Sequence, residues 1–124
     1  MTNSAAPARL LLIEDNEITR EGMCAVLRQA GFEVVPSADG RQALDFLAAG
    51  EQPDLMLLDM LMPGVDGWAV LKEVRAQDYR FPVLIVTGSI LTKEWALSHG
   101  CPGFLHKPIE TDALLNEVNR LLRH

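Results

Sequence analysis

The sequence lacks features that several functional classes require. Its 124 residues carry 11 lysines and arginines against 17 aspartates and glutamates, a net charge of −6. A protein that binds nucleic acid directly needs a basic surface, so this shortage of positive charge argues against that function. No apolar run approaches the roughly 20 residues that cross a bilayer, and we therefore expect no membrane segment.

Residues that form disulfides or hold soft metals are also few. The two cysteines, Cys24 and Cys101, form no CxxC or metal-type spacing. The three histidines, His99, His106 and His124, show no ligand spacing either. Residues 1–8 lack the basic and long apolar segments of a secretory signal, and we expect them to be a short disordered tail before one domain at 9–123. A reduced, cytoplasmic protein is the resulting expectation.

What the chain does contain is a regular alternation of two kinds of segment. Apolar runs without helical period predict strands at residues 8–13, 32–35, 54–58, 83–86 and 103–106. Amphipathic stretches predict helices at 16–31, 39–50, 66–74, 92–98 and 111–122, the first three opening at Asn16, Asp39 and Asp66. Strict alternation of this kind predicts an α/β fold, a doubly wound five-stranded parallel sheet flanked by five helices.

Polar residues stand where several of these strands end. Glu14 and Asp15 follow the first strand, Asp59 the third, and Lys107 the fifth, while Thr87 ends the fourth. In the common strand order 2-1-3-4-5, the first and third strands are neighbours, which would bring the three carboxylates together. Such hard oxygen ligands suit Mg²⁺, and a lysine and a hydroxyl can contact phosphate oxygens. The set suits phosphoryl transfer, which depends on positioning and charge neutralisation.

With these residues, the sequence resembles the receiver domain of bacterial two-component response regulators. The matching motifs are Glu14-Asp15, Asp59 with Met62-Pro63 and Asp66-Gly67, then Thr87, and finally Lys107-Pro108. Each motif alone is weak evidence, whereas their order and spacing together are specific. The resemblance extends over residues 9–122 and implies a receiver domain of the flavodoxin-like type.

The resemblance also implies a role for each matching residue. Asp59 would accept a phosphoryl group from a phosphohistidine. Asp15 and Asp59 would bind Mg²⁺ directly, Glu14 would help through water, and the backbone carbonyl of Leu61 would be a further ligand. The cofactor implied is therefore Mg²⁺.

Three further roles follow from the same resemblance. Lys107 would pair with Asp59 before phosphorylation and with a phosphate oxygen afterwards. Thr87 would move its hydroxyl to the phosphate, and Phe104 would move inward with it. The protein would thus be a conformational switch that is not an enzyme, beyond catalysing its own phosphorylation and slow dephosphorylation.

The implied partners are a sensor histidine kinase or a histidine phosphotransfer protein, because none of the chain's own histidines is a credible donor. A downstream target protein or an output domain would receive the signal, and a phosphorylation-dependent homodimer is a further partner to consider. Two arrangements stay open: a protein that acts alone, and a piece of a longer regulator or hybrid kinase.

Other readings compete with this one. A receiver-like interaction module that is never phosphorylated is the main alternative, although such modules typically lose Asp59, Asp15 or Lys107. A flavin-binding protein would need a glycine- and hydroxyl-rich phosphate loop after the first strand, where this chain has acidic residues. A phosphatase with an aspartate nucleophile would usually carry it after the first strand and have a cap insertion. Asp66 is expected to be only a helix cap.

The sequence departs from the receiver pattern after the fourth strand. The segment from Thr87 to Lys107 is shorter than in many receivers, and Gly88 stands where alanine is common. This segment usually contributes to the output face. We therefore expect the chemistry of the acidic residues to be kept and the surface after the fourth strand to be unusual.

Overall fold

A computed structural model describes residues 6–60, 67–88 and 90–123. The strands are β1 (Arg9–Ile13), β2 (Glu33–Ser37), β3 (Leu55–Asp59), β4 (Val83–Thr87) and β5 (Gly103–His106). The helices are α1 (Glu17–Gln29), α2 (Gly40–Ala48), α3 (Gly67–Ala76), α4 (Lys93–Ser98) and α5 (Thr111–Leu122). No helix in these ranges is long and apolar enough to cross a membrane.

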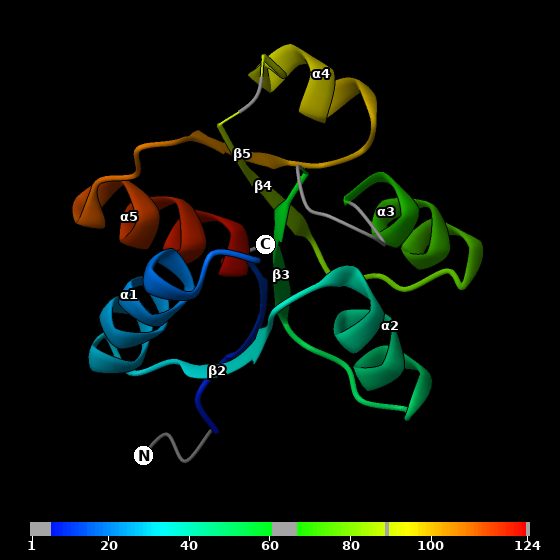
Figure 1. Ribbon diagram of the computed structural model, residues 1–124, viewed down its shortest axis with the longest axis horizontal. Helices are drawn as coiled ribbons and strands as arrows, with labels where there is room; N and C mark the ends of the chain where they lie inside the picture. The colour runs from blue at the N-terminus through cyan, green and yellow to red at the C-terminus, as the bar shows by residue number, and fades with distance from the viewer. Residues whose placement is uncertain (1–5, 61–66, 89, 124) are drawn as a thin grey trace.

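The five strands form one parallel sheet in the order β2-β1-β3-β4-β5, which confirms the predicted fold. Helices α1 and α5 cover one face, and α2 and α3 cover the other, with α4 on the same side as α2 and α3, next to β5 (Figure 1). Because side chains alternate along a strand, the sheet supplies two cores. Leu10, Leu12 and Leu57 face α1 and α5, whereas Leu11, Met56 and Leu58 face α2 and α3.

The central strands β3 and β4 are buried along their whole length. This burial explains why they are continuous apolar runs rather than alternating patterns. The second strand differs from the prediction, because it runs from Glu33 to Ser37 instead of ending at residue 35. It contains Pro36, which lacks a backbone N–H, and β2 tolerates this because it is an edge strand.

Helix starts follow the predicted capping chemistry where the structure describes them. The Asn16 side chain accepts a hydrogen bond from the Thr19 N–H at 2.9 Å, and Asp39 accepts one from the Gln42 N–H at 2.9 Å. Gly31 follows α1 with φ 99°, a conformation that favours glycine. The predicted cap Asp66 lies outside the described residues.

Helix α3 begins in close contact with the end of β3. A Cβ atom added at Gly67 would lie 2.5 Å from the Met60 Cα and 2.7 Å from the Asp59 carbonyl oxygen. Both of these are backbone atoms, which cannot move aside cheaply. The absence of a side chain at Gly67 therefore allows the helix to start directly against the strand that carries Asp59.

We expect Gly67→Ala to destabilise the protein by about 1–3 kcal/mol, because the added methyl group overpacks this contact. Gly22→Ala in α1 is the matched control, since a Cβ there meets no atom within 4 Å. That change should stabilise the protein by about 0.5–1 kcal/mol through helix propensity. Urea unfolding followed by circular dichroism measures both, and equal effects would contradict the close contact.

Candidate functional site

The carboxyl ends of β1, β3, β4 and β5 meet at one edge of the sheet. Ile13 is paired with Leu58, Asp59 with Val86, and Thr87 with His106. The residues that end these strands or directly follow them, Glu14, Asp15, Asp59, Thr87 and Lys107, are therefore neighbours. The predicted adjacency of the first and third strands is what brings the acidic residues together.

Three carboxylates form the centre of this edge. Glu14, Asp15 and Asp59 each place a carboxylate oxygen within 4.8 Å of the others. Glu14 is 1% exposed and Asp59 is 3% exposed, whereas Asp15 is open to solvent. Two buried carboxylates so close together are costly without positive charge. Their oxygen donors fit a hard cation such as Mg²⁺, and the exposed Asp15 leaves solvent access on one side.

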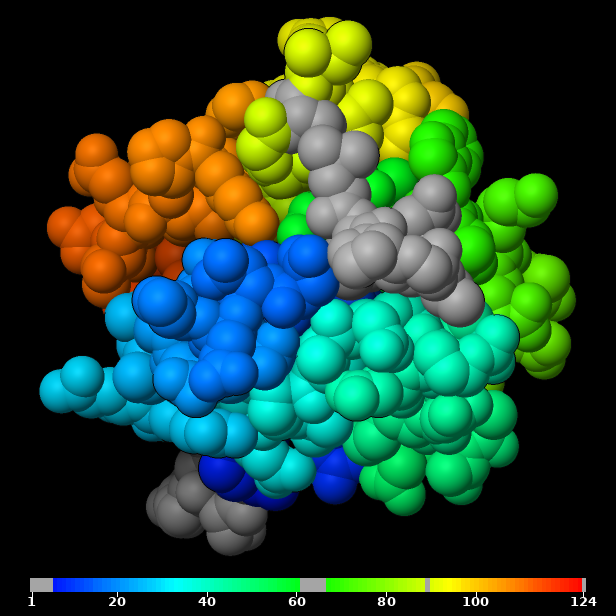
Figure 2. Space-filling model, in the orientation of Figure 1, coloured from blue at the N-terminus to red at the C-terminus, as the bar shows by residue number. Residues whose placement is uncertain are grey.

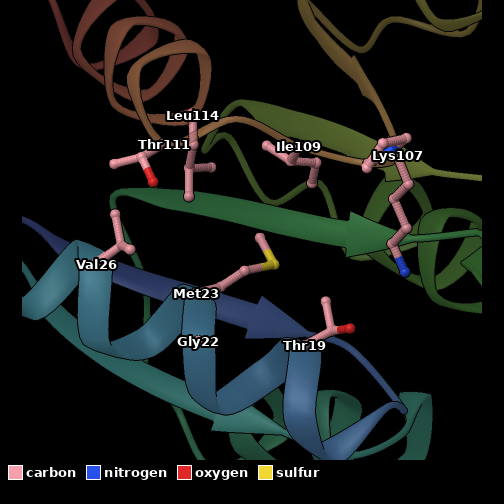
Figure 3. Close-up of a pocket in the computed structure, with 9 residues that line it drawn as sticks. Thr19, Gly22, Met23, Val26, Lys107, Ile109, Thr111 and Leu114 are labelled. Atoms are coloured by element: carbon pink, nitrogen blue, oxygen red, sulfur yellow. The ribbon is translucent and has the colours of Figure 1, made fainter.

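Lys107 supplies positive charge from the end of β5. Its Nζ lies 2.7 Å from Glu14 Oε1 and 3.4 Å from Asp59 Oδ2. The expected pairing with Asp59 is present, but the shorter contact is with Glu14, which the sequence had suggested only as a helper through water. Figure 3 shows the lysine stem reaching from its strand toward the carboxyl ends of the neighbouring strands.

The surroundings of Lys107 stabilise its charged form. Burial alone lowers the pKa of Lys107, but the hydrogen bond to Glu14 and the charges of Asp59 and Glu14 outweigh it, so the net pKa lies above the ordinary value. The ammonium group therefore stays protonated at neutral pH. It remains available as a fixed cation beside two buried oxygens.

Arg20 shapes the acidic turn, and the sequence reasoning missed it. Its Nη1 donates to the Glu14 carbonyl at 2.9 Å and lies 3.4 Å from the Asp15 carbonyl. The Asn16 N–H donates to Glu14 Oε2 at 3.1 Å, which orients the carboxylate. The signal was present, because helical side chains point toward the N-terminus and Arg20 lies one turn after the Asn16 cap.

Thr87 and Phe104 lie on the same face of the sheet. Phe104 is paired with Ile85 and His106 with Thr87, so Thr87 and Phe104 belong to the same alternating set of side chains. Thr87 is fully buried, and its carbonyl accepts a hydrogen bond from the Lys107 N–H at 2.9 Å. Phe104 is half-buried against the core under α2 and α3. Leu61, the expected carbonyl ligand, lies outside the described residues.

A groove of about 620 Å³ runs between α1 and α5, beside the acidic residues rather than over them. Met23, Val26, Ile109 and Leu114 give it apolar walls, as Figure 3 shows. Of the groups that meet at the strand ends, Lys107 alone is among its lining residues. The groove thus adjoins the site without containing its carboxylates.

Sequence comparisons identify proteins similar to this chain. A family model described as the response regulator receiver domain matches residues 10–119. Response regulator MprA of Mycolicibacterium vanbaalenii is 34% identical over 119 residues, which are 94% of this chain and 51% of that protein. The C4-dicarboxylate transport transcriptional regulatory protein DctD of Pseudomonas aeruginosa is 35% identical over 94% of this chain and 26% of its own. The chain therefore spans about half the length of MprA and a quarter of DctD.

Solved structures agree with the sequence comparison. The chemotaxis protein CheY4 of Vibrio cholerae has a TM-score of 0.83 and 33% identity, covering 94% of this chain and 99% of its own. The receiver domain of the Francisella response regulator 1452 has a TM-score of 0.86 and 27% identity, covering 94% of this chain and 97% of its own. Both cover nearly the whole of the five-stranded fold.

We expect Asp15→Asn to weaken Mg²⁺ binding by roughly tenfold or more, because it removes one ligand charge from the acidic set. Asp45→Asn is the matched control, since Asp45 is an exposed acid on α2 outside that set. Isothermal titration calorimetry of both variants and the parent protein measures the effect. An unchanged affinity in Asp15→Asn would remove this residue from the ligand set.

Proposed function

Because the chain belongs to the response regulator receiver domain family, we propose that it is a switch of two-component signalling whose phosphoacceptor is Asp59. Receiver domains are the signalling domains of response regulators. The observation that carries the assignment is the surroundings of Asp59: a nearly buried carboxylate with Lys107 at 3.4 Å and two further acids close by. The main alternative is a receiver-like interaction module that is never phosphorylated.

In the proposed transfer, a carboxylate oxygen of Asp59 attacks the phosphorus of a phosphohistidine. The donor is a sensor histidine kinase or a histidine phosphotransfer protein. An O–P bond forms as the P–N bond breaks, and the leaving imidazole takes the electron pair. Asp15 and Asp59 would hold Mg²⁺ directly and Glu14 through water, with the Leu61 carbonyl as a further ligand. When bound, Mg²⁺ supplies positive charge that offsets the charge of the phosphoryl oxygens.

Lys107 has two acidic neighbours, and this suits both states of the switch. Before transfer, its ammonium group bridges Glu14 and Asp59. After transfer, we propose that it keeps Glu14 and contacts a phosphate oxygen in place of the Asp59 carboxylate. The movement required is small because Nζ is already within 3.4 Å of the acceptor.

Thr87 and Phe104 are proposed to carry the signal from the site. The Thr87 hydroxyl would move toward the phosphate, and the space it leaves would let the Phe104 ring move inward on the same face of the sheet. Phe104 is half-buried and packs against the core under α2 and α3, so an inward movement would bury more of its ring. Such a coupling turns a local charge change into a packing change.

The proposed recipients are a target protein, an output domain of a longer chain, or a second copy after phosphorylation. No further enzymatic activity is proposed beyond slow loss of the phosphoryl group. A cytoplasmic location is consistent with Cys24 and Cys101, which are buried free thiols.

Incubation with acetyl phosphate and Mg²⁺, followed by intact-protein mass spectrometry, is expected to show one added phosphoryl group. The adduct should be absent in Asp59→Asn and with EDTA, and it should persist in the control Asp45→Asn. An adduct that survives in Asp59→Asn would move the acceptor elsewhere. No adduct in the parent protein, together with failure to bind beryllofluoride, would favour the unphosphorylated module.

The proposed coupling predicts that Thr87→Val is still phosphorylated but loses the conformational response. Valine keeps the shape of threonine and removes the hydroxyl that would contact the phosphate. The readout is the change in the Phe104 ring signals by nuclear magnetic resonance on adding beryllofluoride, and Thr87→Ser should restore it. A normal Phe104 response in Thr87→Val would contradict the coupling.

A further inference from the structure

A second, open pocket lies along α3, beside the C-terminal end of α4, and shares no residue with the acidic site. Its volume is about 410 Å³, and its walls are mostly apolar. The lining residues are Trp68, Leu71, Lys72, Arg75, Ala76 and His99. Figure 2 shows α3 and α4 meeting at the upper right of the molecule. A pocket of this size accommodates one or two large side chains of a partner.

An aromatic cluster holds one wall of this pocket in place. The Trp68 ring meets Trp95 edge-on at 5.3 Å and His99 edge-on at 5.2 Å, and the Trp95 and His99 rings stack at 4.2 Å. His99 Nδ1 lies 2.7 Å from the Trp95 carbonyl oxygen, which fixes the imidazole on its helix. Because these rings are already ordered, a ligand would bind them at little conformational cost.

Trp68 keeps a large apolar surface in water despite these contacts. Its exposed fraction is 43%, although tryptophan usually buries most of its area. Exposed tryptophan beside an apolar pocket is typical of the residues that dominate binding energy at protein interfaces. The pocket therefore has a preformed anchor point.

The charge at this pocket is opposite to that of the whole chain. Its two charged lining residues, Lys72 and Arg75, are both cations, whereas the protein carries a net charge of −6. Within the described ranges, neither forms an ion pair with a carboxylate. Arg75 Nη2 instead donates to the neutral His99 carbonyl at 2.7 Å, which positions the guanidinium without neutralising it. The positive charge thus stays available for a ligand.

We propose that this pocket binds an acidic segment of a partner protein, which inserts an apolar side chain against Trp68 and places carboxylates on Lys72 and Arg75. Two cations are too few for a nucleic-acid surface, and a nucleic acid would leave the apolar wall beside Trp68 unfilled. Binding of a second copy of the chain is a separate outcome that the test below distinguishes. This proposal does not depend on phosphorylation of Asp59.

The test uses the unphosphorylated full chain and a capped peptide, Glu-Asp-Phe-Leu-Glu-Asp. The sequence has two tryptophans, and their indole N–H signals in nuclear magnetic resonance report on the pocket, because Trp68 lines it and Trp95 contacts Trp68. Titration should move both signals with a submillimolar dissociation constant. Added salt should raise that constant, because it screens the charges. A peptide with lysines in place of the acids, and one with serines in place of Phe-Leu, should both fail to move them.

Variants test whether binding depends on the cations of the pocket or on the overall charge of the protein. Lys72→Glu should lower the affinity for the peptide by about tenfold. Arg41→Glu makes the same charge change on an exposed α2 residue and should alter that affinity by less than about twofold. Trp68→Ala should abolish binding, and circular dichroism checks that it folds. If it does not fold, the Lys72 and Arg41 pair decides the matter alone.

Several results would overturn the proposal. These are indole signals unmoved at millimolar peptide, equal binding of the lysine peptide, or equal weakening by Lys72→Glu and Arg41→Glu. Signals that move with protein concentration alone would assign the pocket to a second copy instead. A failed acetyl phosphate experiment would leave these outcomes unchanged, because they are measured without phosphorylation.

Discussion

The structure depends most on how two buried carboxylates are tolerated at the end of a parallel sheet. Glu14 and Asp59 lie within 4.8 Å of each other, and at an effective dielectric near 20 their repulsion is on the order of 3 kcal/mol. The attraction between Lys107 and Glu14 at 2.7 Å is on the order of 6 kcal/mol on the same basis. The Coulomb attraction of one lysine is thus at least comparable to the repulsion of the buried pair, before the cost of burying the charges. Asp15, the third acid, is left to solvent.

The sheet fixes the positions of these charged groups. Strands β1, β3 and β4, which lead to Glu14, Asp59 and Thr87, are packed on both faces, so their ends cannot move apart without opening a core. The Lys107 N–H is bonded to the Thr87 carbonyl, which ties the lysine to the neighbouring strand. Arg20 holds the backbone of the acidic turn from the other side. The polar groups are thus positioned by rigid elements rather than by one another.

The same edge also fixes the surroundings of the site. Gly67 lets α3 begin against the Asp59 carbonyl, and Trp68 is the next residue of that helix. From Trp68 the aromatic contacts continue to α4, which is only six residues long. The short segment after β4 that distinguishes this sequence is therefore anchored by rings to α3, as well as by its connection to β5.

Much of this follows from the sequence by itself. Continuous apolar runs predicted the central strands, and strict alternation with helices predicted a parallel sheet, because few other topologies bury such strands on both faces. The residues at the strand ends predicted which carboxylates and which lysine would meet. The edge strand β2 was predicted to end two residues early; it continues through Pro36, which an edge strand tolerates.

Only the tertiary structure decided the finer arrangement. Lys107 lies closer to Glu14 than to Asp59, which depends on side-chain reach across two strands and cannot be derived from residue order. The Arg20 contact and the ring cluster of Trp68, Trp95 and His99 likewise join residues whose partners are set by helix packing. The periodicity of the sequence located the strands, and so determined which residues stand at their ends. The packing of elements distant along the chain determined which of them touch.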